Sequence, residues 1–223
     1  MAAFLDTFFY GFDHAVLQGV HDFSVATHGA LTPLMRLITL LGDGGLCFML
    51  FGIILLLFRR TRKIGIAVLL AIAIGGIMTN LTLKPLVARA RPYEQEPFRT
   101  WWQYVGASLE SERSFPSGHA TVSFAAMGAV FFSCRKKYSW ATLILAALVA
   151  FTRLYLMVHY PTDVVAGVLV GLAAALGAFG LTLLLYRILE KHETNPVSRF
   201  LLQASPSTTL RRCSRRKQSH DHT

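Results

Sequence analysis

Two long segments of the chain carry no charged side chain. Residues 64–83 and 164–186 are uncharged over 20 and 23 positions. A helix needs about 20 apolar residues to cross the hydrocarbon core of a bilayer. Because backbone N–H and C=O groups in lipid must bond to each other, these segments are expected to be helical. They predict two spanning helices.

Three further apolar segments extend this pattern. Residues 45–58 are apolar but short, and residues 37–44 can lengthen them into a span. Residues 117–134 contain His119 as their one basic or acidic side chain, and residues 138–158 contain Arg153. The sequence therefore predicts an all-α fold, a polytopic membrane helix bundle with about five spanning helices.

The first 28 residues have an amphipathic pattern instead. Phenylalanine and leucine are interspersed there with Asp6, Asp13 and Asp22, which is typical of a helix that lies in the membrane interface. A tilted sixth span through residues 4–20 is the alternative. No positively charged start precedes a clean apolar core, so a signal peptide is not expected.

The composition agrees with a membrane protein. Hydrophobic residues make up 53% of the chain and charged residues 15%, against about 25% charged in an average soluble domain. This hydrophobicity excludes disorder of most of the chain, and three widely spaced cysteines exclude a disulfide scaffold. The expected organisation is an N-terminal amphipathic helix (1–28), a membrane helical domain (29–188) and a basic tail (189–223).

The net charge of +10 is unevenly distributed. Basic clusters follow the first, third and fifth spans, within residues 59–63, 135–137 and 187–217. The positive-inside rule places these ends in the cytoplasm, so we expect a multi-pass cell-membrane protein with a disordered cytoplasmic tail. That tail is a topology signal or, alternatively, touches anionic lipid. No nucleic-acid partner is expected, because no folded binding module accompanies the tail, and the sequence has no signal for an oligomeric state.

The other charged residues gather at the opposite, extracytoplasmic ends of the spans. Ionisable groups at membrane depth are costly and indicate a functional site, and the excess of cations favours an anionic ligand. Each residue alone is also compatible with an anchor that reaches the lipid headgroups. The residues concerned are Lys84, Arg89, Arg91, His119, Arg153, His159 and Asp163.

Spacing predicts how the first cations are presented. Lys84 and Arg91 are seven positions apart, so they share a helix face if the helix continues past Pro85. Pro92 would then end the helix.

A second anion-binding element is predicted at the start of the third span. Pro116 suits the first position of a helix, and the backbone N–H groups that follow are free to bind an anion. The Ser117 hydroxyl adds a donor, and Gly118 permits close approach of a ligand. His119 can supply or accept a proton near neutral pH.

The third cluster supplies a nucleophile. His159 and Asp163 are four apart, so the carboxylate can hold one ring nitrogen and leave the other as a base or nucleophile. Arg153 can bind two phosphate oxygens at once. Together these groups are suited to phosphoryl transfer. No cofactor is expected; His159 and Asp163 could pair on a metal ion, but the surrounding cations disfavour one.

Three motifs carry a family resemblance: Lys84-x6-Arg91-Pro92, Pro116-Ser117-Gly118-His119 and Arg153-x5-His159-x3-Asp163. In order, spacing and position at span ends they resemble the signature of the type 2 phosphatidic acid phosphatase superfamily, over about residues 30–186. Thr152 stands where the family usually has Ser, and it keeps the hydroxyl donor.

The resemblance implies a role for each motif residue. His159 would attack phosphorus and form a phosphohistidine, Asp163 would orient it, and His119 would protonate the leaving oxygen and then activate water. The hydrolysis would need no metal. Arg89 lies outside the motif and is expected behind the site or on a headgroup. The phosphate would be held by Lys84, Arg91, Arg153, Ser117 and the N–H of Gly118.

The expected function is therefore a lipid phosphatase in the bilayer, with undecaprenyl diphosphate hydrolysed at the extracytoplasmic face. A broad phosphatidic acid or phosphatidylglycerophosphate phosphatase is one alternative, and a small anion or lipid transporter without hydrolysis is another. The aromatic loop 93–114 is the expected specificity element. The Gly42-Asp43-Gly44 break is predicted to be a helix hinge, with no catalytic role for Asp43 because no partner lies nearby in sequence.

Overall fold

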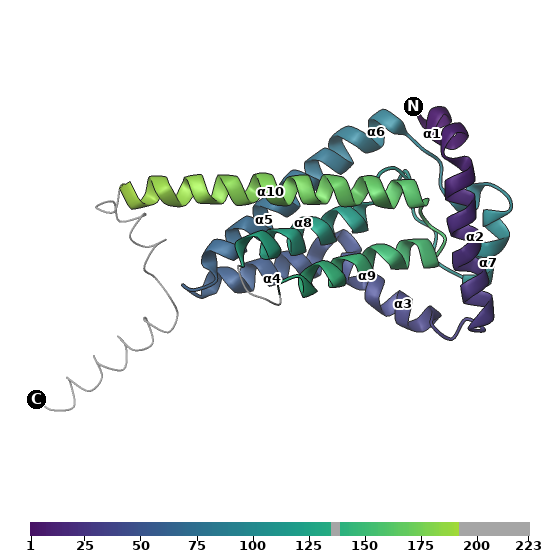
Figure 1. Ribbon diagram of the computed structural model, residues 1–223, viewed down its shortest axis with the longest axis horizontal. Helices are drawn as coiled ribbons and strands as arrows, with labels where there is room; N and C mark the ends of the chain where they lie inside the picture. The colour runs from purple at the N-terminus through teal and green to yellow at the C-terminus, as the bar shows by residue number, and fades with distance from the viewer. Residues whose placement is uncertain (135–138, 192–223) are drawn as a thin grey trace, which may run out of the picture.

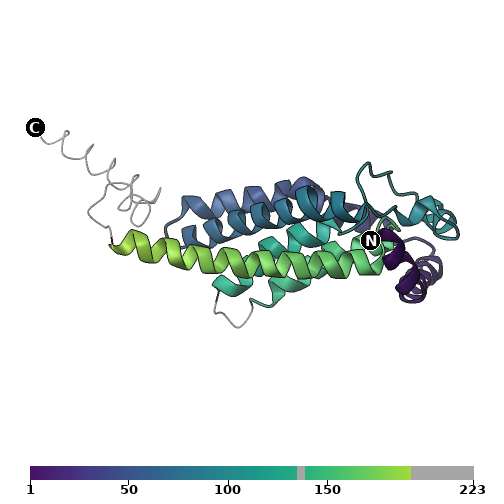
Figure 2. The same ribbon diagram turned by 90° about the horizontal axis from the view of Figure 1, so that it is seen from above.

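The computed structural model describes residues 1–134 and 139–191 of the 223-residue chain. These residues form helices and connecting segments, with no strand among them. The long helices pack into an elongated bundle, and two N-terminal helices lie across one end of it (Figures 1 and 2). The basic cluster 135–137 and nearly all of the predicted tail lie outside the described residues.

All five predicted spans are helical, which confirms the membrane helix bundle. Within the described residues, three segments are long and apolar enough to cross a membrane: Thr32–Leu57, Arg62–Glu94 and Pro161–Lys191. Two shorter apolar helices, α8 (Gly118–Ser133) and α9 (Ala141–Tyr155), complete the set.

The first span is broken where the hinge was predicted. It consists of α3 (Thr32–Thr39), a 3₁₀ segment (Leu40–Gly45) and α4 (Leu46–Leu57). Asp43 is extended, with φ −63° and ψ 115°, and Gly44 and Gly45 have φ of 55° and 70°. Glycine adopts such left-handed conformations without steric cost, so the Gly-Asp-Gly-Gly sequence is what allows this bend.

The second span extends a few residues beyond the uncharged segment 64–83. It runs through α5 (Arg62–Gly76), a π-helical segment (Ile77–Leu83) and α6 (Lys84–Val87). Ala88 then has φ 51° and ends the helix. The helix continues past Pro85 but ends at Val87, so Pro92 does not end it and Lys84 and Arg91 do not share a helix face. Arg91 reaches the site from a loop.

The loop between the second and third spans contains two short helices that the sequence pattern did not reveal, a 3₁₀ turn (Pro92–Glu94) and α7 (Phe98–Val105). Ser117 then caps α8, which begins at Gly118. The prediction that Pro116 occupies the first helical position is wrong, because Pro116 lies before the cap.

Close helix packing holds α8 against α10 (Pro161–Lys191). A Cβ atom on Gly167 would lie 2.6 Å from the Ser117 carbonyl oxygen, and one on Gly171 would lie 2.6 Å from that of Thr121. Small residues at helix interfaces let backbones approach in this way. The contact fixes the start of α8 beside the start of α10, where two of the three motifs lie.

The outer faces of the bundle are apolar. Large side chains of α4 and α10 are exposed there, as lipid-facing residues would be, among them Leu50, Ile53, Leu169, Leu176 and Leu184.

The N-terminal helices α1 (Ala2–Phe8) and α2 (Tyr10–Ala26) differ in direction from the spans. In Figure 1 α2 runs across the long axis of the bundle, beside α7. This orientation supports an interfacial helix rather than a sixth span, and the interfacial position stays a prediction.

Candidate active site

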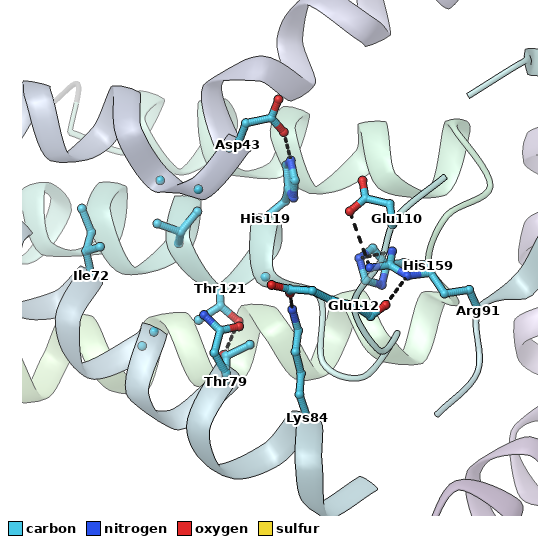
Figure 3. A pocket seen from close by; sticks show the side chains of 18 residues that line it. Asp43, Ile72, Thr79, Lys84, Arg91, Glu110, Glu112, His119, Thr121 and His159 are labelled. Atoms are coloured by element: carbon cyan, nitrogen blue, oxygen red, sulfur yellow. Dashed lines mark hydrogen bonds and ion pairs between the residues drawn. The ribbon is translucent and has the colours of Figure 1, made fainter. Parts of the chain in front are cut away.

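A polar cavity of about 280 Å³ lies at the end of the bundle that carries the three motifs. Its walls come from the 3₁₀ segment of the first span, the end of the second span, the loop before α8, and the segment between α9 and α10. Figure 3 shows charged side chains from these elements pointing toward one another. The charged and imidazole lining residues are Asp43, Lys84, Arg91, Glu110, Glu112, His119 and His159.

His159 and Asp163 are both buried and lie side by side. Nδ1 of His159 is 3.6 Å from Oδ2 of Asp163. The Ser114 hydroxyl donates to Asp163 Oδ2 at 2.5 Å and lies 3.4 Å from the same Nδ1. The predicted carboxylate–imidazole pair is therefore present, with Ser114 as an additional partner that the sequence analysis missed.

The other ring nitrogen of His159 faces a cation. Nη1 of Arg91 lies 3.2 Å from Nε2 of His159. Because a guanidinium can only donate, Nε2 acts as the acceptor and Nδ1 carries the proton. Nε2 therefore presents a lone pair, as a nucleophile requires.

The pKa of His159 lies well below its usual value, chiefly because the ring is buried and further because Arg91 and Arg153 repel a second positive charge. A buried imidazole beside two cations stays neutral. The neutral form is the nucleophilic one.

The three predicted phosphate-binding cations converge, and carboxylates of one loop hold them. Lys84 pairs with Glu112. Glu110 pairs with Arg153 and lies 3.6 Å from Nη2 of Arg91. The loop around Glu110 thus places anionic groups among cations that are suited to an anionic ligand.

The two arginines favour the ionised form of the Glu110 carboxylate. Burial alone would raise its pKa, but Arg153 and Arg91 outweigh that effect and lower the pKa below its usual value. An opposite charge within a few ångströms favours the ionised carboxylate. Neither glutamate was singled out from the sequence, because nothing in the composition of the loop distinguishes them from its other acidic residues.

Two buried donors at the site have no partner among the described residues. They are Oγ of Ser117 and Nε of Arg153. Buried polar atoms are nearly always hydrogen-bonded, so both donors are suited to bind an anionic ligand. Lys84 lies close by, since a Cβ atom on Gly118 would be 3.8 Å from its Nζ. The Thr152 hydroxyl, in contrast, donates to the Val149 carbonyl at 2.6 Å.

His119 has a partner that the sequence analysis did not identify. Its Nε2 lies 2.7 Å from Oδ1 of Asp43. The sequence analysis gave Asp43 no catalytic role because no partner lies nearby in sequence. Its partner is 76 positions away, and the bend in the first span carries Asp43 to the start of α8.

Arg89 is buried behind the site and does not contact headgroups. Its guanidinium donates to Asp163 at 2.8 Å, to Asp13 at 2.8 Å and to Asp6 at 2.7 Å. It also stacks 3.9 Å from the Tyr160 ring centroid. Of the two predicted positions for Arg89, the one behind the site is therefore correct.

The aromatic side chains of the loop pack away from the cavity. Trp101 stacks on His21 of α2, with ring centroids 5.2 Å apart, and Phe98 meets Tyr160 edge to face. None of the loop's tryptophans or Phe98 lines the cavity at His159. In the part of the chain described, no group of three or more His, Cys, Asp or Glu is placed to hold a metal ion.

The fold and the motifs define a class of protein that comparison with known families also identifies. The sequence profile of the PAP2 superfamily matches residues 64–187, more than half of the chain. The protein belongs to this superfamily, which confirms the resemblance seen in its motifs.

Individual relatives are similar over about half of the chain. An undecaprenyl-diphosphatase of Sulfolobus acidocaldarius is 36% identical over 121 residues, 53% of this chain and 55% of that one. A bacitracin transport permease protein of Bacillus licheniformis, BcrC, is 34% identical over 134 residues, 59% of this chain and 64% of that one. The chain thus spans less than two thirds of the length of either relative.

A solved structure has the same fold. The transmembrane PAP2-type phosphatidylglycerolphosphate phosphatase of Bacillus subtilis superposes with a TM-score of 0.63 at 24% identity, over 81% of this chain and 89% of that one.

Proposed function

We propose that the protein is a membrane lipid phosphatase that works through a phosphohistidine on His159. The observation that carries the proposal is the lone pair of His159 Nε2 beside Arg91 and near Arg153, with a carboxylate and Ser114 behind the ring. A substrate phosphate would replace Glu110 between Arg91 and Arg153. His119 borders the same cavity and would serve as the proton donor.

The reaction follows from these positions. Nε2 of His159 attacks phosphorus, and the arginines and Lys84 stabilise the charge that builds on the phosphoryl oxygens. His119 protonates the leaving oxygen, and it then removes a proton from the water that hydrolyses the phosphohistidine. Asp163 keeps Nδ1 of His159 protonated and stabilises the positive charge on the ring.

We propose undecaprenyl diphosphate as the substrate. The name of the Sulfolobus relative supports this choice. An active site on the extracytoplasmic side is part of the proposal. Its support is that the basic turn between α4 and α5 lies at the end of the bundle opposite to α2 and the site (Figure 1), where the positive-inside rule predicts the cytoplasm.

The test is phosphate release by detergent-purified protein in EDTA, with undecaprenyl diphosphate and phosphatidic acid side by side. We expect faster release from the diphosphate, and loss of at least about 10³-fold in His159→Ala with the fold retained, since the nucleophile is removed. Comparable release from both lipids would instead indicate a broad phosphatase. Undiminished release by His159→Ala would contradict the mechanism.

A transporter is the second candidate, and the name of the BcrC relative favours it. It predicts lipid or anion flux across proteoliposomes without phosphate release, and flux that survives His159→Ala. Hydrolysis that depends on His159 would exclude it as the sole function.

A further inference from the structure

The bend in the first span packs closely against His119. A Cβ atom on Gly42 would collide with the imidazole of His119 and lie 3.1 Å from Cγ1 of Val149. A Cβ atom on Gly45 would lie 2.8 Å from Cγ2 of Val122, one turn further along α8. The bend therefore approaches α8 as closely as glycine allows, and it does so on both sides of Asp43.

The backbone of this bend presents the Asp43 carboxylate to the ring. The backbone is helical up to Gly42 and extended at Asp43, and Gly44 and Gly45 then adopt left-handed conformations. Its Oδ1 lies 2.7 Å from Nε2 of His119. The His119 side chain is 12% exposed and the Asp43 side chain 53%, so the carboxylate keeps access to water while the ring it holds is largely enclosed.

The contact selects one tautomer of His119. An ionised carboxylate can only accept a hydrogen bond, so Nε2 carries a proton. Nδ1 has no hydrogen-bond partner in the described residues and is left for the substrate. His159 is arranged in a related way: a carboxylate lies at its Nδ1, and the proposed reaction takes place at Nε2, which accepts a hydrogen bond from Arg91.

We propose that Asp43 is a positioning residue that holds Nε2 of His119 so that Nδ1 exchanges protons with the leaving group and with water. The inference rests on the proposed phosphatase function. It adds a residue that lies outside the three motifs and comes from the first span.

The proton and electron balance is straightforward. When Nε2 of His159 bonds to phosphorus, the P–O bond to the leaving group breaks, and its electron pair stays on the leaving oxygen. His119 enters this step as the imidazolium, with a proton on each ring nitrogen. The leaving oxygen takes the proton from Nδ1, and the neutral ring keeps its Nε2–H on Asp43. In the second step water attacks phosphorus, its proton goes to Nδ1, and the N–P bond breaks with its electron pair returning to His159. Asp43 stays ionised throughout.

The leaving group offers a test that a structural role does not predict. An alkoxide leaving group needs protonation, whereas 4-nitrophenolate leaves readily without an acid. We would measure kcat/KM, which reports the first phosphoryl transfer, on dioctanoyl phosphatidic acid and on 4-nitrophenyl phosphate. The proteins are the wild type, Asp43→Asn, Asp43→Glu and, as a matched control on exposed Asp22 of α2, Asp22→Asn.

Asp43→Asn is expected to lose about 10–100-fold on phosphatidic acid and less than about 3-fold on the nitrophenyl ester, because acid catalysis contributes roughly 10²–10⁴-fold in all and His119 remains. Asp43→Glu should recover part of the loss, and Asp22→Asn should match the wild type. If Asp43→Asn does not fold, Asp43→Glu provides the test. It should lose kcat/KM on phosphatidic acid by a smaller factor, with little loss on 4-nitrophenyl phosphate.

Equal losses on both esters, or no loss on either, would overturn the role of Asp43 while leaving the phosphatase assignment intact. Absence of phosphate release by the wild-type protein from both esters and from undecaprenyl diphosphate would instead overturn the proposed function, and this inference with it.

Discussion

His159 depends on its neighbours for its reactivity. Burial and the two arginines keep the pKa of its imidazole low, while Ser114 and Asp163 lie beside Nδ1. A free histidine near neutral pH is partly protonated and cannot attack phosphorus in that form. The surrounding residues therefore extend toward acid pH the range in which the proposed nucleophile, neutral His159, is available.

This environment predicts the pH dependence. Because the pKa of His159 is lowered, the neutral ring persists to more acid pH, and the acid limb of kcat/KM is expected below pH 6.5, the usual value for histidine. A profile of kcat/KM from pH 4 to 9 measures it. Arg91→Gln removes one cause of the shift and should move the limb toward higher pH, whatever its effect on the maximal rate. An acid limb above pH 6.5 in the wild type would contradict the prediction.

At the scale of elements, the loop before α8 occupies the site that it borders. Glu110 bridges Arg91 and Arg153, and Glu112 pairs with Lys84. The same loop contributes Ser114 to the His159–Asp163 pair. One loop thus both contacts the His159–Asp163 pair and competes for the cations that would bind a phosphate in the proposed mechanism.

Competition by Glu110 can be measured directly. Glu110→Gln removes the negative charge that opposes an incoming phosphate, so orthovanadate should inhibit about 3–10-fold more tightly, a difference of roughly 1 kcal/mol as expected for one partly exposed ion pair. The readout is the inhibition constant for vanadate during phosphate release. Glu96→Gln, the same change in the same loop but at an exposed residue paired with Thr100, is the control. Weaker inhibition in Glu110→Gln would mean that Glu110 assists binding.

For the whole molecule, Arg89 joins the N-terminal helices to Asp163, the partner of His159. Its guanidinium lies among carboxylates of α1, α2 and α10, while Asp13 also accepts from the Thr162 backbone N–H at 2.9 Å. The helices that cross the end of the bundle are thereby connected through one buried cation to Asp163. Loss of that cation leaves the carboxylates buried without a counter-charge.

Arg89→Ala is therefore expected to destabilise the protein by about 3–5 kcal/mol, the usual cost of leaving a buried charge unpaired. Thermal unfolding in detergent measures it, and phosphate release should fall as Asp163 loses its partner. Arg89→Lys keeps the charge but not the planar fork of donors, so this variant should lose less unfolding free energy than Arg89→Ala. A melting temperature of Arg89→Ala equal to that of the wild type would show that water or lipid replaces the arginine.

The sequence by itself determined the class of fold and the main reactive groups. Long uncharged segments have few alternatives to membrane helices, because lipid cannot satisfy backbone hydrogen bonds. The motif residues could be recognised in the sequence because each cluster lies within a short stretch of chain. His159 and Asp163, for example, are four positions apart. Local spacing was sufficient to predict their contact, because residues four positions apart are brought together within one turn of the chain.

Only the tertiary structure decided which residues complete the site. Asp43 and His119 are 76 positions apart, Glu110 and Arg153 are 43 apart, and Arg89 and Asp13 are 76 apart. Such contacts depend on how whole helices pack, and no local pattern records them. The helix end at Val87 belongs to the same category. A left-handed conformation of Ala88 is not favoured by its own sequence, and the buried contacts of Arg89 follow directly after it.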